Sequence, residues 1–335
     1  MKKNCLLFLS LFTLVMLFNA CSTDVDLYAG YKDITVIYGL LDSDKDTNYV
    51  KINRAFLGPG NALEIAMIAD SCNYSSKLDA KIVEYRATPG GNNYQKSGRE
   101  LVLDTMTIHN KDTEGFFYAP DQLVYYTTEP VYTNSERYKY KYELLVDRGD
   151  TILSAETDMT GGYGFNINTA TISFSGESGT PIKWYPCPNA AIYEVVLRFD
   201  YMELKGPFDT VHQSIEWSLG TYPESSLELD HNMYVVSHKS EAFYTKLAEK
   251  LQGDTIGVDR LVANPAICIS IAAGNEELYN FISVNAPSSS IVQSIPEYTN
   301  VKGGYGVFAS RTMQEKLVKF NSIYDIAKWG FREIK

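Results

Sequence analysis

Along much of the chain, apolar and polar residues alternate with a period of two, which is the pattern of strands that bury one face. The clearest case is the stretch 138–146 (YKYKYELLV). There Tyr138, Tyr140, Tyr142 and Leu144 share one face, and lysines share the other. The pattern predicts a strand with one apolar and one polar face.

Similar stretches, separated by turn residues, continue from residue 33 to residue 158. We expect strands at 33–41, 48–56, 77–88, 99–107, 122–128, 138–146 and 151–157, with a further apolar stretch at 115–118. One short helix is expected to begin at Asn61, whose side chain has a carboxylate, Glu64, three residues on. Residues 31–159 therefore predict an antiparallel β-sandwich. Its last hairpin, with a leading tyrosine, resembles the end of immunoglobulin-like sandwiches.

The glycine-rich stretch 160–164 (TGGYG) predicts a domain boundary, with a second domain over residues 165–335. We expect strands at 167–174, 182–184, 191–197, 266–272, 291–295 and 306–310, and helices at 240–252 (ended by Gly253), 278–283 and 322–329. Trp184, followed on the next strand by Tyr193 and Val195, resembles fibronectin type III modules. The prediction for this domain is a fibronectin III-like β-sandwich with helical insertions.

The N-terminus carries two lysines, Lys2 and Lys3, and then an apolar run over 6–18. As a helix this run would rise about 20 Å, short of the ~30 Å hydrocarbon core, so residues 1–20 predict a cleaved signal peptide. A cysteine directly after the small residue Ala20 resembles the lipobox of bacterial lipoproteins. The resemblance implies that Cys21 carries a diacylglycerol, with acyl chains of the palmitate type, and becomes the mature N-terminus. An ordinary secretory signal is the alternative, and residues 21–30 are expected to be a tether.

The formal net charge is −11. Nucleic-acid binding needs clustered lysine and arginine to offset phosphate repulsion, so this charge argues against it. It also argues against adsorption to anionic lipid. Attachment to a membrane would therefore come from the lipid on Cys21.

Three cysteines remain once the signal peptide and Cys21 are set aside: Cys72, Cys187 and Cys268. They are widely spaced and no C-x-x-C occurs, so at most one disulfide could form. Buried free thiols are the expected state, and whether any two of them pair stays open.

No sequence motif assigns a catalytic or metal site. Asp42, Asp44 and Asp46 form D-x-D-x-D, but Thr47 and Asn53 stand where an EF-hand needs glycine and glutamate. A solvated hairpin turn is expected there, with a looser calcium site as the alternative. The chain contains no H-E-x-x-H and no G-x-S-x-G, so we expect no enzyme activity and no cofactor.

Two segments, 34–58 (beginning ITVIYGLLD) and 300–310 (NVKGGYGVFAS), resemble uncharacterised Bacteroidetes outer-membrane lipoproteins. Those are domain-of-unknown-function families often encoded beside TonB-dependent receptors. The resemblance implies an outer-membrane lipoprotein with a non-catalytic accessory or ligand-binding role, partnering such a transporter, and it carries no catalytic residue.

Exposed tyrosine and tryptophan would supply the contact area of such a protein. Trp217 and Tyr222 are the first candidates, with packing in the core as the alternative for both. Two other classes stay open: a fimbria-like adhesive or structural subunit, and a surface hydrolase of glycan or peptide that uses a pair of carboxylates.

Overall fold

The computed structural model describes residues 32–57, 61–109, 112–115, 118–119, 121–206, 209–251, 258–286 and 297–334. The predicted signal peptide and tether, Cys21, Gly253 and the strand expected at 291–295 lie outside these residues. Strands account for 51% of the residues and helices for 15%, so the predicted mainly β fold, with several sheets, is confirmed. Among the described residues, no helix has the length and apolar character that crossing a membrane requires.

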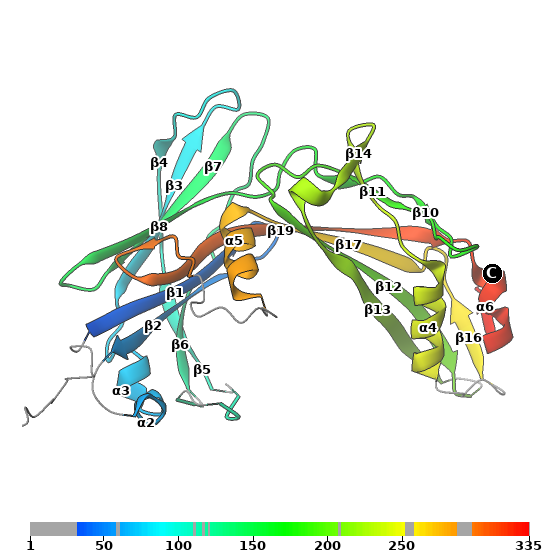
Figure 1. Cartoon of the computed structure of the whole chain (residues 1–335), viewed down its shortest axis with the longest axis horizontal. Coiled ribbons are helices and arrows are strands. Elements are labelled where there is room, and N and C mark those ends of the chain that lie inside the picture. Colours follow the sequence, from blue (N-terminus) through cyan, green and yellow to red (C-terminus); the bar gives the residue numbers. More distant parts are fainter. Residues whose placement is uncertain are drawn as a thin grey trace, which may run out of the picture.

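The elements of the first half of the chain follow the predicted order (Figure 1). They are β1 (Lys32–Asp42), β2 (Asn48–Leu57), α2 (Ala62–Ala66), α3 (Ala69–Cys72), β3 (Asp79–Ala87), β4 (Gln95–Val102), β5 (Asp104–Ile108), β6 (Gln122–Thr127), β7 (Lys139–Asp147) and β8 (Ile152–Asp158).

The second half has more strands than the sequence pattern predicts, and β12 and β19 are longer than expected. The strand expected at 167–174 is wrong, because only the two-residue strands β9 and β10 form there. Its strands are β9 (Asn166–Ile167), β10 (Thr171–Ile172), β11 (Ile182–Tyr185), β12 (Ile192–Leu204), β13 (Thr210–Pro223), β14 (Glu228–Asp230), β15 (Met233–Val236), β16 (Asp259–Val262), β17 (Ile267–Gly274), β18 (Val301–Lys302), β19 (Tyr305–Phe320) and β20 (Phe331–Glu333). Its helices are η1 (Glu224–Ser226), α4 (Ser240–Leu251), α5 (Glu276–Asn285), α6 (Ile323–Ile326) and η2 (Ala327–Trp329).

Two sheets face each other in the first half and enclose one apolar core. One sheet has the order β1-β2-β6-β5 and the other the order β18-β8-β7-β3-β4. Leu41, Tyr125 and Leu144, from both sheets, are among the buried residues between them. The strand predicted at 99–107 is two strands, because the chain turns at buried Leu103 from the second sheet into the first.

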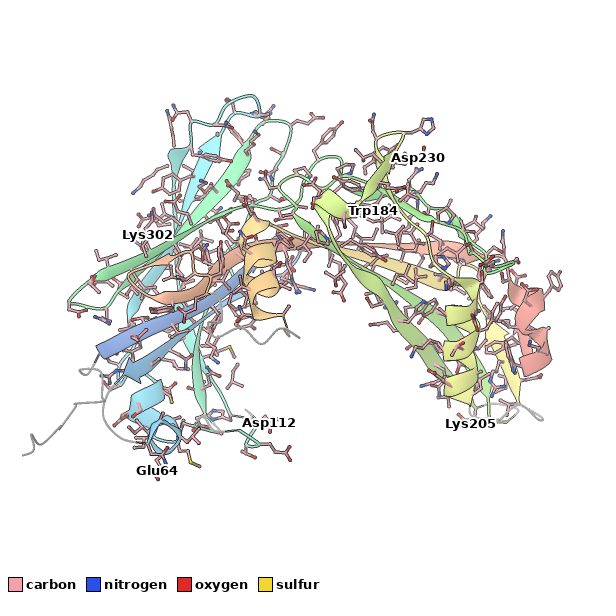
Figure 2. All side chains as sticks on the ribbon, viewed as in Figure 1. Glu64, Asp112, Trp184, Lys205, Asp230 and Lys302 are labelled. Atoms are coloured by element: carbon pink, nitrogen blue, oxygen red, sulfur yellow. The ribbon has the colours of Figure 1, made fainter. Side chains whose placement is uncertain are left out.

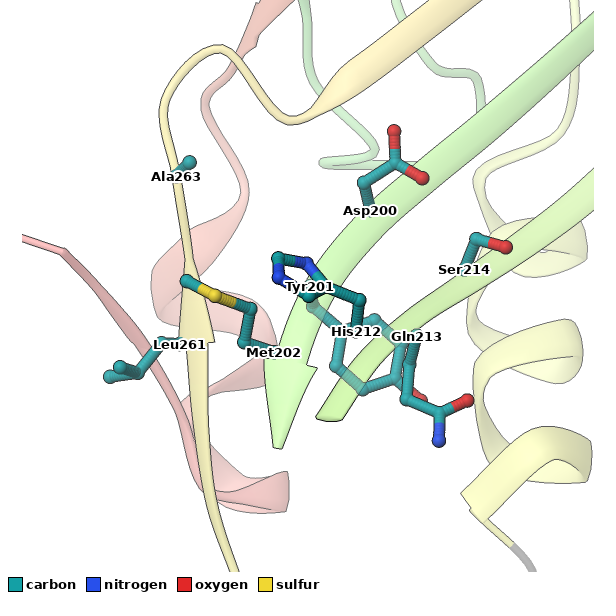
Figure 3. A pocket seen from close by; sticks show the side chains of 8 residues that line it. All are labelled: Asp200, Tyr201, Met202, His212, Gln213, Ser214, Leu261 and Ala263. Atoms are coloured by element: carbon teal, nitrogen blue, oxygen red, sulfur yellow. The ribbon is translucent and has the colours of Figure 1, made fainter. Parts of the chain in front are cut away.

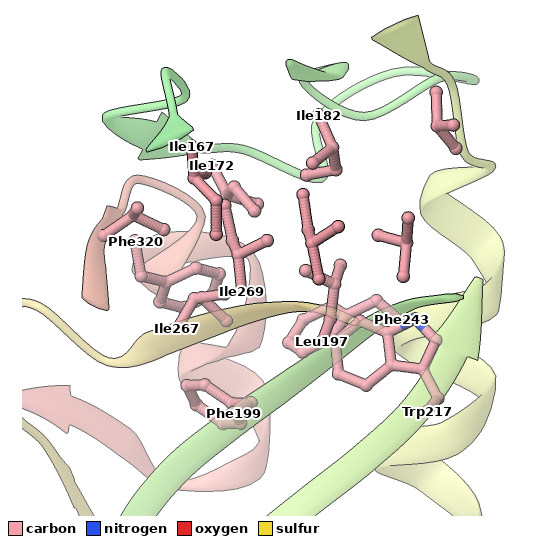
Figure 4. Packing of buried hydrophobic residues seen from close by; sticks show 14 of the residues in the cluster. Ile167, Ile172, Ile182, Leu197, Phe199, Trp217, Phe243, Ile267, Ile269 and Phe320 are labelled. Atoms are coloured by element: carbon pink, nitrogen blue, oxygen red, sulfur yellow. The ribbon is translucent and has the colours of Figure 1, made fainter. Parts of the chain in front are cut away.

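The second half forms its own core between two sheets, with α4 covering one side (Figure 1). The smaller sheet has the order β14-β15-β11-β9. The other is part of one large sheet, of order β20-β16-β12-β17-β19-β1-β2-β6-β5, in which β13 also pairs with β12. Aromatic rings fill the centre of this core (Figure 4). Phe174 and Phe243 stack with their centroids 4.1 Å apart. Figure 2 places Trp184 in the upper part of this half, and its ring contacts Tyr193 at 5.6 Å.

One strand, β19, belongs to both halves, while the division into two domains at residues 160–164 stays a prediction. Its first residues pair in parallel with β1, from Val36↔Tyr305 to Asp42↔Arg311. Its later residues pair antiparallel with β17, ending at Ile267↔Val318. The large sheet therefore continues across the molecule, and the C-terminal segment predicted for the second domain returns to complete the first core. Assignment of the halves to the immunoglobulin-like and fibronectin III-like classes stays a prediction.

Buried hydrogen bonds reinforce this junction. The Thr160 backbone N–H donates to Ser310 Oγ at 2.8 Å, and Ser310 Oγ donates to the Asp158 carbonyl at 2.7 Å. Asn275, the N-cap of α5, donates to Thr157 Oγ1 at 2.7 Å. The two halves are thus linked by one strand and by paired polar groups that water does not reach.

Candidate binding surface

Trp217 is not a surface residue, so the prediction that it supplies contact area is wrong. It lies on β13 with 7% of its surface exposed and contacts Phe174 and Phe243 with centroid distances of 5.9 and 5.6 Å (Figure 4). The strand alternates, and Trp217 is on its inward face. Core packing, the alternative reading, is the correct one.

Tyr222 is half-buried at the end of the same strand and packs against the same core. Its hydroxyl donates to the Leu219 carbonyl at 2.8 Å, and burial raises its pKa. It is a packing residue with one edge in solvent, so it offers little contact area.

The three aspartates of the first hairpin turn differ from one another. Asp42 is buried and its Oδ2 accepts from Arg311 Nε at 3.1 Å. Asp44 Oδ2 accepts from Thr312 Oγ1 at 2.8 Å, and Asp46 is exposed. The prediction of a solvated hairpin turn is therefore wrong for Asp42, whose side chain is buried and bonded to β19. No group of three or more His, Cys, Asp or Glu suited to a metal ion occurs in the part of the chain that the structure describes.

Cys72, Cys187 and Cys268 are free and buried, as expected. Burial raises the pKa of the Cys187 thiol to about 12, which keeps it protonated and unreactive at neutral pH.

An array of aromatic and cationic side chains, partly exposed and partly half-buried, lies at the end of the second sheet of the first half. We call it the tyrosine–arginine cluster: Arg86 of β3, Arg99 of β4, Tyr140 of β7, and Tyr132 and Tyr138 from the loop before β7. Tyr132 and Tyr138 are 45% and 37% exposed. Sequence reasoning placed Tyr138 and Tyr140 on a strand face but did not bring the arginines to them.

Each arginine of the cluster lies over a tyrosine ring. The Arg99 guanidinium carbon is 4.6 Å from the Tyr132 centroid, and that of Arg86 is 5.1 Å from the Tyr138 centroid. The Tyr140 ring joins the two pairs, at 6.0 Å from Tyr132 and 6.3 Å from Tyr138. Cation–π contacts of this kind contribute roughly 0.5–1 kcal/mol each at exposed sites, so they favour the observed arrangement of the array.

A buried carboxylate anchors the cluster from below. Glu84, 1% exposed, accepts from Arg99 Nη1 at 2.6 Å, and its other oxygen lies 4.0 Å from Arg86 Nε. The Tyr142 hydroxyl is 3.2 Å from Glu84, and burial, followed by the charge of Glu84, raises the pKa of this phenol. A β-bulge between Val83 and Tyr85 falls at this point of β3, and bulges commonly redirect a side chain.

A depression of about 370 Å³ is lined by residues of the loop that also carries Tyr132 and Tyr138, and by residues of the second half. Asn134, Glu136, Lys139 and Tyr163 are among its lining residues, and Tyr163 is 72% exposed. Tyr163 belongs to the GGYG stretch, where Gly162 has a φ of 110° and no room for a Cβ, which would lie 1.9 Å from the Asn134 carbonyl oxygen. The surface therefore combines fixed tyrosines with arginine and lysine in a chain whose net charge is −11.

Another depression, of about 420 Å³, lies near the turn that joins β12 to β13, with side chains from both strands and from the β16 segment (Figure 3). Asp200 supplies the one carboxylate among its lining residues and accepts from Arg198 Nε at 3.1 Å. A hydrolytic carboxylate pair is therefore not formed by the residues that line it.

The comparisons with known proteins add no family: a scan against protein-family models found no match, and neither did a search of curated proteins.

Proposed function

We propose that the mature chain is an outer-membrane lipoprotein, anchored through a lipid on Cys21, that binds a TonB-dependent transporter through the tyrosine–arginine cluster. In this role the protein is a non-catalytic accessory subunit. The anchor rests on the apolar run and cysteine of the N-terminus, and the class of partner on the sequence resemblance.

The observation that carries the binding role is the fixed geometry of the cluster. Tyrosine and arginine are the residue types most enriched where protein interfaces gain their binding energy. Here both arginines are already stacked on tyrosine rings, and Arg99 is bound to buried Glu84. These contacts reduce the side-chain entropy that the arginines would lose on binding, which favours affinity.

The anchor also restricts where the partner can be. Eleven residues lead from Cys21 to Lys32, and an extended chain of this length spans at most about 40 Å. The first half of the fold, which carries the cluster, would therefore stay close to the membrane surface. A partner embedded in the same membrane fits this restriction.

Affinity purification from membranes of the native host, in mild detergent, tests the proposal. The wild-type lipoprotein should retain a TonB-dependent receptor, and the variant Arg86→Ala/Tyr138→Ala should lose at least about tenfold of it. Tyr324→Ala, which removes a tyrosine that is 90% exposed at the far end of the second half, is the matched control and should retain the receptor. Purification of the wild type without any such receptor would contradict the proposal.

A further inference from the structure

A second hollow lies on the other sheet of the first half, on the outer face of β1 and β2. Its volume is about 340 Å³, and Tyr38, Lys51, Asn53, Cys72, Tyr118 and Gln122 are among its lining residues. We call it the β1–β2 pocket. Ligand pockets span about 300–1,000 Å³, so this one has room for a small molecule.

Amide side chains in the pocket are held in a fixed chain of hydrogen bonds. Asn53 Nδ2 donates to the Cys72 carbonyl at 3.0 Å, and Gln122 Nε2 donates to Asn53 Oδ1 at 3.2 Å. These hydrogen bonds orient both amides and use only part of their hydrogen-bonding capacity. The second N–H of each amide and Gln122 Oε1 take no part in these two bonds. The pocket thus offers donors and acceptors side by side.

The rest of the pocket wall is largely apolar. Val36 and Ala55 lie on the strands beneath it, and Tyr38 is 42% exposed at its edge. An edge-to-face contact with Phe281 of α5, with centroids 5.9 Å apart, holds the Tyr38 ring in place. A fixed and partly exposed aromatic face can stack against an apolar ligand surface.

Charges around the pocket nearly balance. Lys51 and Arg54 are cationic and Asp121 is anionic, while Arg54 Nε is paired with Asp33 Oδ1 at 2.9 Å. A strongly charged ligand would meet no excess of opposite charge here. The site favours a neutral molecule that has both an apolar face and a rim of groups able to donate and accept.

We propose that the β1–β2 pocket binds one or two pyranose rings of a neutral sugar. A pyranose has C–H faces that stack on tyrosine, and each hydroxyl both donates and accepts, which matches the Asn53 and Gln122 amides. The pocket and the tyrosine–arginine cluster lie on different sheets, so this binding does not depend on docking to a transporter.

Saturation-transfer NMR on the chain beginning at Ser22 tests the proposal. The probes are methyl α-glucoside, methyl α-mannoside, methyl β-galactoside, methyl β-xyloside, lactose and maltose, each at about 10 mM, which detects dissociation constants near 1 mM. At least one sugar should receive saturation. Tyr38→Ala and Gln122→Leu should each weaken its binding about tenfold or more, and Tyr38→Phe should bind as the wild type does.

Tyr49→Ala is the matched control, because Tyr49 is 48% exposed on the same face of β2 but does not line the pocket. It should leave sugar binding unchanged. The proposal is overturned if none of the six sugars receives saturation, or if Tyr38→Ala and Tyr49→Ala bind equally well at unchanged melting temperature. Binding of glycylglycine in place of every sugar would also overturn it, in favour of a zwitterionic ligand.

Discussion

Replacement of Arg99 by alanine tests whether the tyrosine–arginine cluster is organised by its buried carboxylate. The change removes the guanidinium that lies 2.6 Å from Glu84, which is itself 1% exposed. Removing one partner of a buried ion pair costs about 3–5 kcal/mol, because the other charge is left without compensation. Arg99 is 30% exposed and Arg86 Nε remains 4.0 Å from Glu84, so we expect a loss below that range, about 2–3 kcal/mol.

The melting temperature of the chain beginning at Ser22, measured by calorimetry at pH 7, reports this cost. At about 2.1 cal/mol/K of unfolding entropy per residue, a loss of about 2–3 kcal/mol lowers the melting temperature of a chain of about 310 residues by roughly 3–5 °C. The double variant Arg99→Ala/Glu84→Gln has no buried charge to leave unpaired, and should recover a third or more of the loss. Arg137→Ala, an exposed arginine on the neighbouring loop, is the control and should change little.

Two results would refute this reasoning. One is a melting temperature of Arg99→Ala within about 1 °C of the wild type, which would mean that the ion pair contributes nothing to stability. The other is a double variant as unstable as the single one, which would assign the loss to packing of the arginine stem over its tyrosine.

Three further outcomes are expected. The hydrogen bond from Tyr85 to Glu143 raises the pKa of the Tyr85 phenol from 10.0 to about 12, so the folded protein holds this proton more tightly than the unfolded chain does. The free energy of unfolding should therefore fall as the pH rises from about 10 to about 12. Denaturant titrations of Tyr85→Phe should show a smaller fall over the same pH range. Gly306→Ala should lower the melting temperature far more than Gly149→Ala. Both glycines have positive φ, but only at Gly306 of the two would a Cβ lie 1.9 Å from a carbonyl oxygen of β1. Equal effects of the two substitutions would contradict the close approach of β1 and β19. Cys21→Ser should abolish labelling by a palmitate analogue, and a wild type that stays unlabelled would refute the lipid anchor.

The sequence predicts the strands of the first half well because their inward residues are apolar. The later part of β19 was missed for the opposite reason. Its inward positions include Thr312, Gln314 and Lys316, and Lys316 is satisfied by the Ile167 carbonyl at 2.9 Å rather than by apolar neighbours. Such a strand has no period-two hydrophobic pattern by which it could be predicted. Its pairing with both halves is set by the tertiary structure, which the local sequence pattern does not reveal.

The tyrosine–arginine cluster left one signal in the sequence. Ala80 and Ile82 face the core on alternate positions of β3, and the next inward position is Glu84. A carboxylate at an inward position requires a buried partner, which indicates an arginine nearby. Which arginine it is depends on the pairing of β3 with β4, and that pairing is set by the fold.

Photo-crosslinking in cells of the native host tests the central claim most directly. A benzoylphenylalanine in place of Tyr138, within the cluster, should give a covalent adduct with a TonB-dependent receptor, identified by mass spectrometry. The same probe in place of Tyr324, at the opposite end of the molecule, should give none. Absence of the receptor adduct from position 138, or equal adducts from both positions, would contradict the claim that the cluster is the surface by which this protein holds its partner.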